Sequence, residues 1–226
     1  MDKIVIFGTG DFSSLAHFYF NEDTEHEVVA FTMNKEWITE DSFEDKPVIA
    51  FGDILKLYPP NEYKLFAPMS FKQMNDNRKK IFNKGKELGY TFATYISSKS
   101  TVWSNNKIGE NCFITEHNAI NPFVEIGNNC VLWNSNHIGH HTKIKDHVFI
   151  TSQVVICGQC VIGNNSFFGV NSSLRDETTV EDYTLVGMGA NIVKDTKKGD
   201  VWIGAKSSPK NYKSWELDSI SHKSKG

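Results

Sequence analysis

An aliphatic residue or a phenylalanine stands at every sixth position from Ile96 to Ile192, seventeen times in succession and without an insertion. Four residues after each of these positions comes a small or uncharged residue, never a charged one. Glycine and asparagine, which tolerate the positive φ of a tight corner, gather between these two places, as in the hexads that begin at Ile108, Ile126 and Ile162. Each hexad therefore predicts one short strand followed by one corner.

A six-residue period is typical of a parallel β-helix, in which three hexads form one triangular coil. Residues that are one coil apart in sequence then stack at the strand spacing of about 4.8 Å. The seventeen hexads cover residues 96–197, which corresponds to about 5.7 coils and to a prism on the order of 27 Å long. Unrelated strands would not keep this register, so we favour the β-helix. The period leaves its handedness open.

The residues before the repeat follow a different pattern, in which strands alternate with helices. We expect strands at residues 3–8, 27–33 and 64–69, and helices at residues 13–20 and 75–88. This order predicts a small α/β layer with a parallel, Rossmann-like sheet.

The chain is therefore expected to divide into three parts. Residues 1–95 form the α/β domain, in which the acidic segment 34–47 is expected to be a loop, and residues 96–197 form the prism. Residues 198–226 carry a last strand at 201–205 and a tail rich in Lys and Ser, which is expected to be partly helical or frayed. Because a solenoid needs covered ends, the two flanking parts are expected to cap the prism.

The composition excludes several classes of protein. A net charge of -3 and a pI near 6.2 give no basic field for nucleic acid or for an anionic membrane. Four cysteines in 226 residues are too few for a disulfide scaffold. The short apolar run after Lys3 is too brief for a signal peptide, and no long apolar run follows. We expect a cytoplasmic protein with free thiols.

A glycine-rich turn follows the first expected strand. The sequence GTGDF supplies Gly8 and Gly10, but Ser13 stands where a dinucleotide fingerprint needs its third glycine. A turn of this kind before a helix still offers free N–H groups to phosphate oxygens. We therefore expect a site for a nucleotide moiety rather than for a full dinucleotide; a plain tight turn is the alternative.

The cysteines are expected to be structural. In the hexad frame Cys112, Cys130 and Cys160 occupy the small inward place, whereas Cys157 faces away. The side chains of Cys157 and Cys160 therefore diverge, although their spacing alone would suit zinc or redox chemistry. The three inward cysteines are most simply small apolar core residues.

Four histidines gather in the segment NHIGHHTKIKDH, and His140 and His141 fall at a corner, where side chains point outward. Zinc needs converging imidazoles, and Thr142 stands where His137 would need its partner, so we expect no metal. One coil above His140 is Gly158, which leaves space for a ligand beside a free backbone N–H. This arrangement favours a general base for acyl transfer; a solvated surface histidine is the alternative.

The repeat from WNSNHIGHH to FFGVNSS, preceded by KIVIFGTG, resembles the left-handed β-helix acyltransferases of the sialic-acid O-acetyltransferase and bacillosamine-pathway N-acetyltransferase family. The resemblance runs from Lys3 to about Lys206. It implies a homotrimer that transfers acetyl from acetyl-CoA to an amine of a nucleotide-linked amino-dideoxy sugar. No metal is implied, and neither nucleic acid nor a membrane is expected as a partner. A sugar O-acetyltransferase and a non-catalytic β-helical binding module are the alternatives.

The resemblance also implies roles for individual residues. His140 matches the family's base, and His141, here counted with it as catalytic, stands where the bacillosamine enzymes have an acidic residue that orients the base. Asn34 ends the segment FTMN, where family members carry acidic residues. The implied acetyl-CoA residues are Phe149, Gly158, Val170, Gly187, Met188 and Lys206, and the implied substrate-binding residues are Gly8, Gly10, Asp11, Phe12, Met33, Asn34 and Met69.

Overall fold

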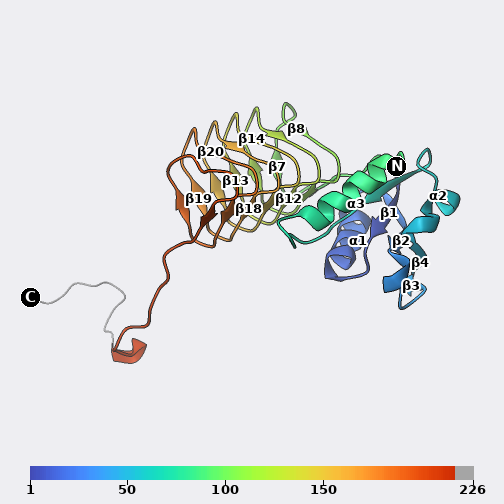
Figure 1. Cartoon of the computed structure of the whole chain (residues 1–226), viewed down its shortest axis with the longest axis horizontal. Helices are drawn as coiled ribbons and strands as arrows, with labels where there is room; N and C mark the ends of the chain where they lie inside the picture. The colour runs from blue at the N-terminus through green and yellow to red at the C-terminus, as the bar shows by residue number, and fades with distance from the viewer. Residues whose placement is uncertain (217–226) are drawn as a thin grey trace, which may run out of the picture.

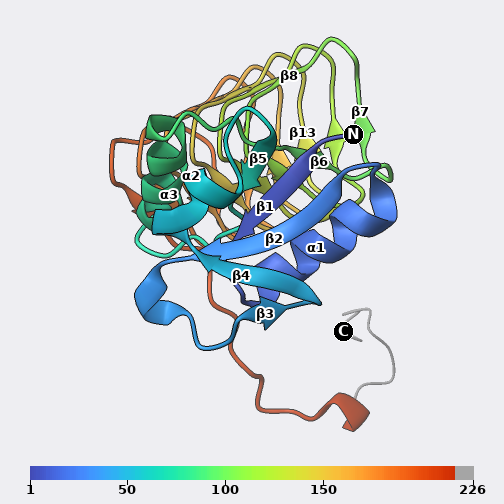
Figure 2. The ribbon, with the colours of Figure 1, turned by 90° about the vertical axis from the view of Figure 1, so that its right-hand side faces the viewer.

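The computed structural model describes residues 1–216 and shows a small α/β unit beside a long prism of stacked coils (Figure 1). The N-terminal unit lies at the end of the prism where the first coils begin, and the chain leaves the opposite end as an extended segment. Figure 2 views the molecule from the side of the N-terminal unit. The tail expected to be helical or frayed has a 3₁₀ turn at Ser214–Glu216, and its remainder lies outside the described residues.

The N-terminal unit is built on a five-stranded sheet with the order β3-β4-β2-β1-β5, in which only β3 is antiparallel to its neighbour. Its elements are β1 (Lys3–Phe7), α1 (Asp11–Asp23), β2 (Glu27–Met33), a 3₁₀ turn (Lys35–Trp37), β3 (Ser42–Phe43), β4 (Lys46–Ala50), a 3₁₀ turn (Phe51–Asp53), α2 (Ile54–Leu57), β5 (Tyr63–Phe66) and α3 (Asp76–Glu87). Strand β5 ends earlier than expected because the chain leaves the sheet there, and the Ala67 N–H donates to Asn111 of the prism instead.

The expectation of a loop at residues 34–47 was wrong. This segment forms the hairpin of β3 and β4, and β4 then adds to the sheet parallel to β2. The hairpin turns at Glu44 and Asp45, whose φ angles are 48° and 58°. Two consecutive residues with positive φ are the hallmark of a type I′ hairpin turn, which usually carries Asn or Gly. Here the turn carries Glu and Asp, so the acidic sequence of residues 34–47 gave no signal of a hairpin.

The prism follows the hexads one strand at a time, and each strand ends at one of the seventeen repeated positions. These strands are β6 Tyr95–Ile96, β7 Thr101–Val102, β8 Lys107–Ile108, β9 Phe113–Ile114, β10 Ala119–Ile120, β11 Glu125–Ile126, β12 Val131–Leu132, β13 His137–Ile138, β14 Lys143–Ile144, β15 Phe149–Ile150, β16 Val155–Ile156, β17 Val161–Ile162, β18 Phe167–Phe168, β19 Ser173–Leu174, β20 Thr179–Val180, β21 Leu185–Val186 and β22 Asn191–Ile192. A further strand, β23 (Val201–Trp202), pairs with β21. The strands form three parallel sheets, which confirms the β-helix.

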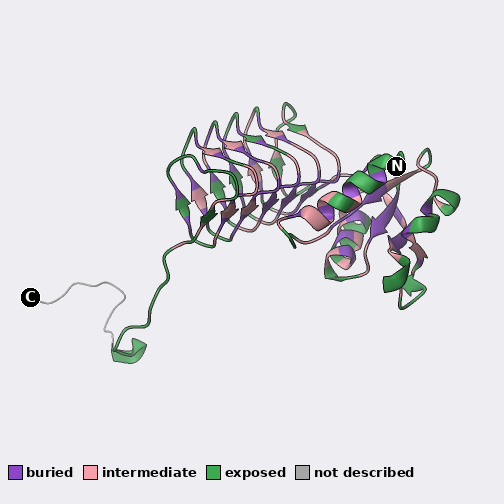
Figure 3. Ribbon diagram, viewed as in Figure 1, coloured by how far each residue is buried: buried purple, intermediate pink, exposed green. Residues whose placement is uncertain are grey.

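The interior of the prism holds the two kinds of residue that the repeat predicts. The repeated aliphatic residues from Ile114 to Ile192 are buried, and the small residues four places later, such as Cys160 and Thr142, are buried as well. Figure 3 shows this buried interior inside the exposed corners. Burial raises the pKa of the Cys160 thiol to about 11, which fits a structural core residue.

The N-terminal unit lies at the expected end of the prism, but it packs against one face of the first coils as well as standing at that end. Outward-facing Tyr95, Phe113 and Val131 share one apolar cluster with Phe20 and Phe66 of the N-terminal unit. Ile96, in the first hexad, remains 36% exposed. The aromatic residues on one face of the prism thus hold the two parts together.

Arg78 of α3 joins the two parts through a buried hydrogen-bond network. Its guanidinium is fully buried and donates to backbone carbonyls on both sides, among them Met69 at 3.2 Å and His147 at 3.2 Å. Burial lowers its pKa to about 10, so it keeps its charge near neutral pH. Asn129 accepts from Arg78 and lies 2.8 Å from His147 Nδ1.

Buried His147 is expected to make the stability of this junction depend on pH. Desolvation lowers the pKa of His147 to about 4, below the value of about 6.5 for an unfolded histidine. The unfolded chain therefore binds a proton before the folded chain does, so stability falls as the pH drops from about 6.5 towards 4. Between about pH 7.5 and about pH 5 we expect a loss of about 2 kcal/mol from this group.

Urea unfolding of the His147→Asn variant measures this contribution. Asparagine occupies the equivalent corner places at Asn111, Asn129 and Asn165, so the variant is expected to fold. Its free energy of unfolding should no longer fall by the amount that His147 contributes between neutral and acid pH. The exposed His137 supplies the matched control, because His137→Asn should leave the dependence unchanged. Equal curves for the wild type and His147→Asn would contradict the prediction.

Candidate functional site

The three faces of the prism have different surroundings, and we name them accordingly. The docked face is the sheet that the N-terminal unit covers, from β6 to β23. The second face runs from β7 to β22, and the third face from β8 to β20. The chain turns from the docked to the second face at the first edge, and from the second to the third face at the far edge. In a triangular prism the far edge lies opposite the docked face.

His140 and Gly158 meet at the far edge, one coil apart, as the hexad frame predicts. A Cβ atom added to Gly158 would lie 2.9 Å from Cε1 and 3.0 Å from Nε2 of His140. The imidazole thus occupies the space that a side chain at position 158 would fill. Both His140 and His141 are exposed, and their Nδ1 atoms lie 3.1 Å apart.

The backbone N–H of Gly158 is not free, which corrects the sequence-based expectation. It donates to the Asp176 carboxylate at 2.8 Å. The same contact recurs at the corner between the third and docked faces, where the N–H of Asn128 donates to Asp146 at 2.7 Å. Each carboxylate lies one coil further along the chain, so the contact is a property of the corner. An incoming carbonyl oxygen would have to compete with Asp176 for the Gly158 N–H.

The other residues assigned to acetyl-CoA lie elsewhere on the prism. Val170, Gly187 and Met188 lie at the first edge, where Met188 is 74% exposed. Phe149 is wrongly assigned: it is 1% exposed on the docked face, with its ring against Phe71 and Arg78. Because α3 and the segment before it cover Phe149, this ring does not line an open cleft.

Lys206 is exposed at the start of the extended C-terminal segment. Within residues 1–216 no group of three or more His, Cys, Asp or Glu side chains could hold a metal ion. None of the helices in this part of the chain is long and apolar enough to cross a membrane.

The glycine-rich turn lies at the carboxyl end of β1. Gly8 has a φ of 109°, and a Cβ atom there would lie 2.8 Å from Ser13 Oγ, so the turn requires glycine. Gly10 precedes α1 without a side-chain cap, and its carbonyl accepts from the Ser13 N–H at 2.8 Å, so the N–H groups of Asp11 and Phe12 are those that an anion could meet in the first helical turn. Asp11 is exposed in this turn, whereas Phe12 packs edge-on against Trp133 of the prism at 5.3 Å.

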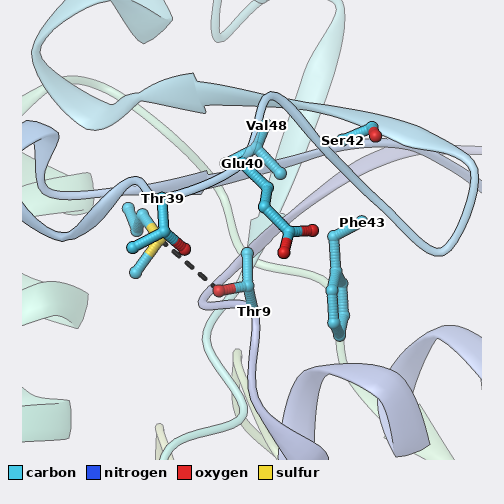
Figure 4. Close-up of a pocket in the computed structure, with 7 residues that line it drawn as sticks. Thr9, Thr39, Glu40, Ser42, Phe43 and Val48 are labelled. Atoms are coloured by element: carbon cyan, nitrogen blue, oxygen red, sulfur yellow. Dashed lines mark hydrogen bonds between the residues drawn. The ribbon is translucent and has the colours of Figure 1, made fainter.

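A cavity of about 190 Å³ opens beside this turn, between the ends of β1 and β2 and the β3–β4 hairpin (Figure 4). Met33 lines it, and the Thr9 hydroxyl donates to the Met33 sulfur at 3.5 Å. Glu40 extends its carboxylate into the cavity, and Phe43 forms a wall. Sequence reasoning missed Glu40 and Phe43 because it treated their segment as a loop.

The remaining two substrate candidates do not line this cavity. Asn34 follows Met33 and begins a 3₁₀ turn. Met69 follows β5 at the same edge of the sheet, where its side chain packs into the core and its carbonyl accepts from Arg78.

The candidate residues therefore form three separate groups within one chain. The cavity and the glycine-rich turn belong to the N-terminal unit on the docked face. Met188 lies at the first edge, and His140 lies at the far edge, across the prism from the docked face. One chain by itself does not bring the cavity and His140 together.

Comparison with protein-family models gives no match, and no curated protein matches this sequence. Solved structures do match. The acetyltransferase domain of PglB from Neisseria gonorrhoeae has a TM-score of 0.76 at 19% identity, over 90% of this chain and 97% of that one. A point variant of perosamine N-acetyltransferase from Caulobacter crescentus, in complex with CoA and GDP-perosamine, has a TM-score of 0.78 at 19% identity, over 90% of this chain and 94% of that one.

WeeI from Acinetobacter baumannii is a more distant match, with a TM-score of 0.54 at 14% identity over 84% of this chain and 96% of that one. At these identities the matches establish the fold: a left-handed parallel β-helix with a small N-terminal α/β domain.

Proposed function

We propose that this chain is an acetyl-CoA-dependent N-acetyltransferase that acts on the amine of a nucleotide-linked amino-dideoxy sugar. The observation that carries the proposal is the exposed imidazole of His140 held over Gly158 at the far edge. A base above a position with no side chain suits a long, thin acyl donor passing between coils. The likeness to an N-acetyltransferase solved with CoA and GDP-perosamine supports this reading.

The proposed reaction follows from acid–base chemistry. A sugar amine is mostly protonated at neutral pH and cannot attack a carbonyl until it loses a proton. An imidazole is suited to accept this proton, because the ordinary pKa of a histidine side chain is about 6.5. The neutral amine then attacks the thioester carbonyl, a carbon–nitrogen bond forms, and the carbon–sulfur bond breaks. The second proton of the attacking nitrogen passes to solvent as the amide forms. The thiolate that leaves takes the proton back from the imidazolium of His140.

The co-substrate is expected to lie between the far edge of one copy and the first edge of another. Exposed Met188 and Val170 offer apolar contacts at the first edge, and Lys206 offers a cation to phosphate groups. The carbonyl oxygen would displace the Asp176 carboxylate from the Gly158 N–H as it becomes negatively charged. The nucleotide end would lie at Gly8, Gly10 and the neighbouring cavity.

A homotrimer is part of the proposal. The cavity and His140 lie on opposite sides of one prism, so a second copy must supply one of them. Large apolar side chains are exposed on the second face and its two edges: Trp103 and Phe123 are each 56% exposed, and Val155 is 43% exposed. Exposed apolar surface of this kind is typical of an interface, and copies placed around a threefold axis would close it. The free cysteines fit a cytoplasmic location.

A thiol-release assay with acetyl-CoA tests the activity. The acceptors are nucleotide-linked 4-amino and 3-amino sugars, the corresponding free amino sugars and sugars with hydroxyl groups only, with product masses as the readout. We expect acetylation of a nucleotide-linked amino sugar. Acetylation of hydroxyl sugars alone would make the chain an O-acetyltransferase. The proposal would be refuted if no acceptor gave an acetylated product.

The Gly10→Asp variant tests the nucleotide end of the site. A Cβ atom at Gly10 has no other heavy atom within 4 Å, and aspartate is a favoured residue before a helix, so the fold should be unaffected. Its carboxylate would repel phosphate at the first turn of α1. We expect the KM for the nucleotide sugar to rise about tenfold or more, which corresponds to about 1.4 kcal/mol.

Gly10→Asn is the matched control because it adds a side chain of the same shape without charge. Steady-state kinetics at fixed acetyl-CoA should give a KM near that of the wild type for this variant. Equal KM values for the aspartate and asparagine variants would show that no phosphate binds at the turn.

A further inference from the structure

We propose that His141 is a positioning residue that fixes the tautomer of His140 and accepts a hydrogen bond from it. The inference rests on the proposed function, in which His140 is the base. His140 and His141 approach through their Nδ1 atoms at 3.1 Å, with ring planes 85° apart. Two ring nitrogens at this distance share one hydrogen: one donates and the other accepts.

The geometry determines which of the two nitrogens donates. Nε2 of His140 lies at the open space over Gly158, 3.0 Å from the position of an added Cβ atom, and is therefore the atom that faces a ligand. A base needs a free electron pair on this atom, so the hydrogen of neutral His140 must lie on Nδ1. Nδ1 of His141 is then the acceptor, and its own hydrogen lies on Nε2.

The backbone and Phe123 hold His141 in this position. His141 has a φ of 59°, and its N–H donates to the Pro122 carbonyl at 3.3 Å. Its ring stacks on Phe123, with centroids 4.7 Å apart and planes 30° apart. Phe123 is one coil earlier at the equivalent corner place and has a φ of 67°. The positive φ is common to this corner place along the prism, so the stacking of two rings, and not the backbone conformation, distinguishes this corner.

The pair completes the proton transfer without a carboxylate. When Nε2 of His140 accepts the proton of the amine, the positive charge is shared along the hydrogen bond with neutral His141. A protonated His141 has no electron pair for this bond, so acid inactivates the pair as well as the base. The coils that pack against it bring Pro122 and Phe123 on one side, and Cys157 and Gly158 on the other. The next charged groups on this edge are Arg175, Asp176 and Glu177, one coil beyond Gly158, and Asp176 is bonded to the Gly158 N–H.

Three variants of residue 141 separate this role from a structural one. His141→Gly tolerates the positive φ but removes the acceptor, and we expect kcat to fall about tenfold or more with KM unchanged. His141→Asn tolerates the same φ and restores an acceptor oxygen, so it should recover most of kcat. His141→Asp supplies a carboxylate that stabilises the imidazolium, and the acid limb of the pH profile of kcat should move up by about one pH unit or more.

NMR of the imidazole nitrogens tests the pair without using activity. In the full-length wild type, the His140 signals, assigned with His140→Gln, should show hydrogen on Nδ1 near neutral pH. In His141→Gly they should show the Nε2–H form or a mixture of both. Phe123→Ala should shift the signals in the same direction, although less strongly.

The outcomes keep the two proposals distinguishable. An Nε2–H tautomer in the wild type, or wild-type kcat and pH profile in His141→Gly, would overturn the role of His141. Equal losses in His141→Gly and His141→Asn would overturn it too, because the acceptor would not matter. A wild type that shows the Nδ1–H tautomer but acetylates no sugar would leave the pair intact and refute the proposed function instead.

Discussion

Replacement of His140 by alanine is expected to lower kcat by about a hundredfold or more, the usual contribution of a positioned general base. The variant should fold normally, because the imidazole is exposed at a corner and its removal leaves no cavity in the core. Its loss leaves the ammonium form of the acceptor without a proton acceptor at the far edge. Binding groups on the N-terminal unit are untouched, so the KM for the nucleotide sugar should change little.

Steady-state kinetics with both substrates measure this effect. His117→Ala is the control, because His117 is also exposed at a corner but lies at the first edge. Its kcat should equal that of the wild type. A His140→Ala variant that keeps full turnover would remove His140 from the mechanism.

The prism could be predicted from the sequence because each hexad encodes one complete local unit. The side chain of Ile156 points inward and that of Thr142 fills a small inner place, and neither depends on a contact with another domain. The stacking of His140 against Gly158 follows from the period alone, since both residues occupy the same place on neighbouring coils.

The errors concern contacts between segments far apart in the chain. Phe149 occupies an outward place, and only the docking of α3 through Arg78 makes it buried. Asp176 takes the Gly158 N–H from three hexads, or one coil, further along the prism, a contact that a search for free backbone donors does not reveal. Glu40 reaches the cavity because the following hairpin turns back onto β2. The contacts of Phe149 and Glu40 have no periodic signal, whereas that of Asp176 recurs one coil apart at other corners, as between Asn128 and Asp146.

Mixing two impaired variants is expected to restore activity, because the proposed site joins the N-terminal unit of one copy to the far edge of another. His140→Ala lacks the base but has a normal glycine-rich turn, and Gly10→Asp has the opposite defect. At a subsaturating concentration of the nucleotide sugar each variant alone should have little activity. In a mixed trimer, a site formed by the turn of the first variant and the His140 of the second is complete.

Random assembly of the two chains in equal amounts gives a definite yield. At a given site the glycine-rich turn comes from a His140→Ala chain half the time, and the base comes from a Gly10→Asp chain half the time. About a quarter of the sites should therefore be active. Co-expression with two different tags and sequential purification leaves the mixed trimers, in which about one site in three joins a normal turn to a normal His140. The double variant His140→Ala/Gly10→Asp, co-expressed with the wild type, controls for the effect of mixing itself.

The result distinguishes a site formed within one chain from a site formed by two copies. The same residues would take part in both. If cavity and base met within one chain, each mixed site would contain one defect, and the activity would stay at the level of the separate variants. His140 and the cavity lie on opposite sides of one prism, so a rearrangement within the chain would have to move the N-terminal unit off the aromatic cluster of Tyr95, Phe113 and Phe20. That movement would expose large apolar surface, which strongly favours a site shared between copies. Recovery of about a third of wild-type activity in purified mixed trimers is therefore the expected outcome, and an unchanged baseline there would refute the shared site.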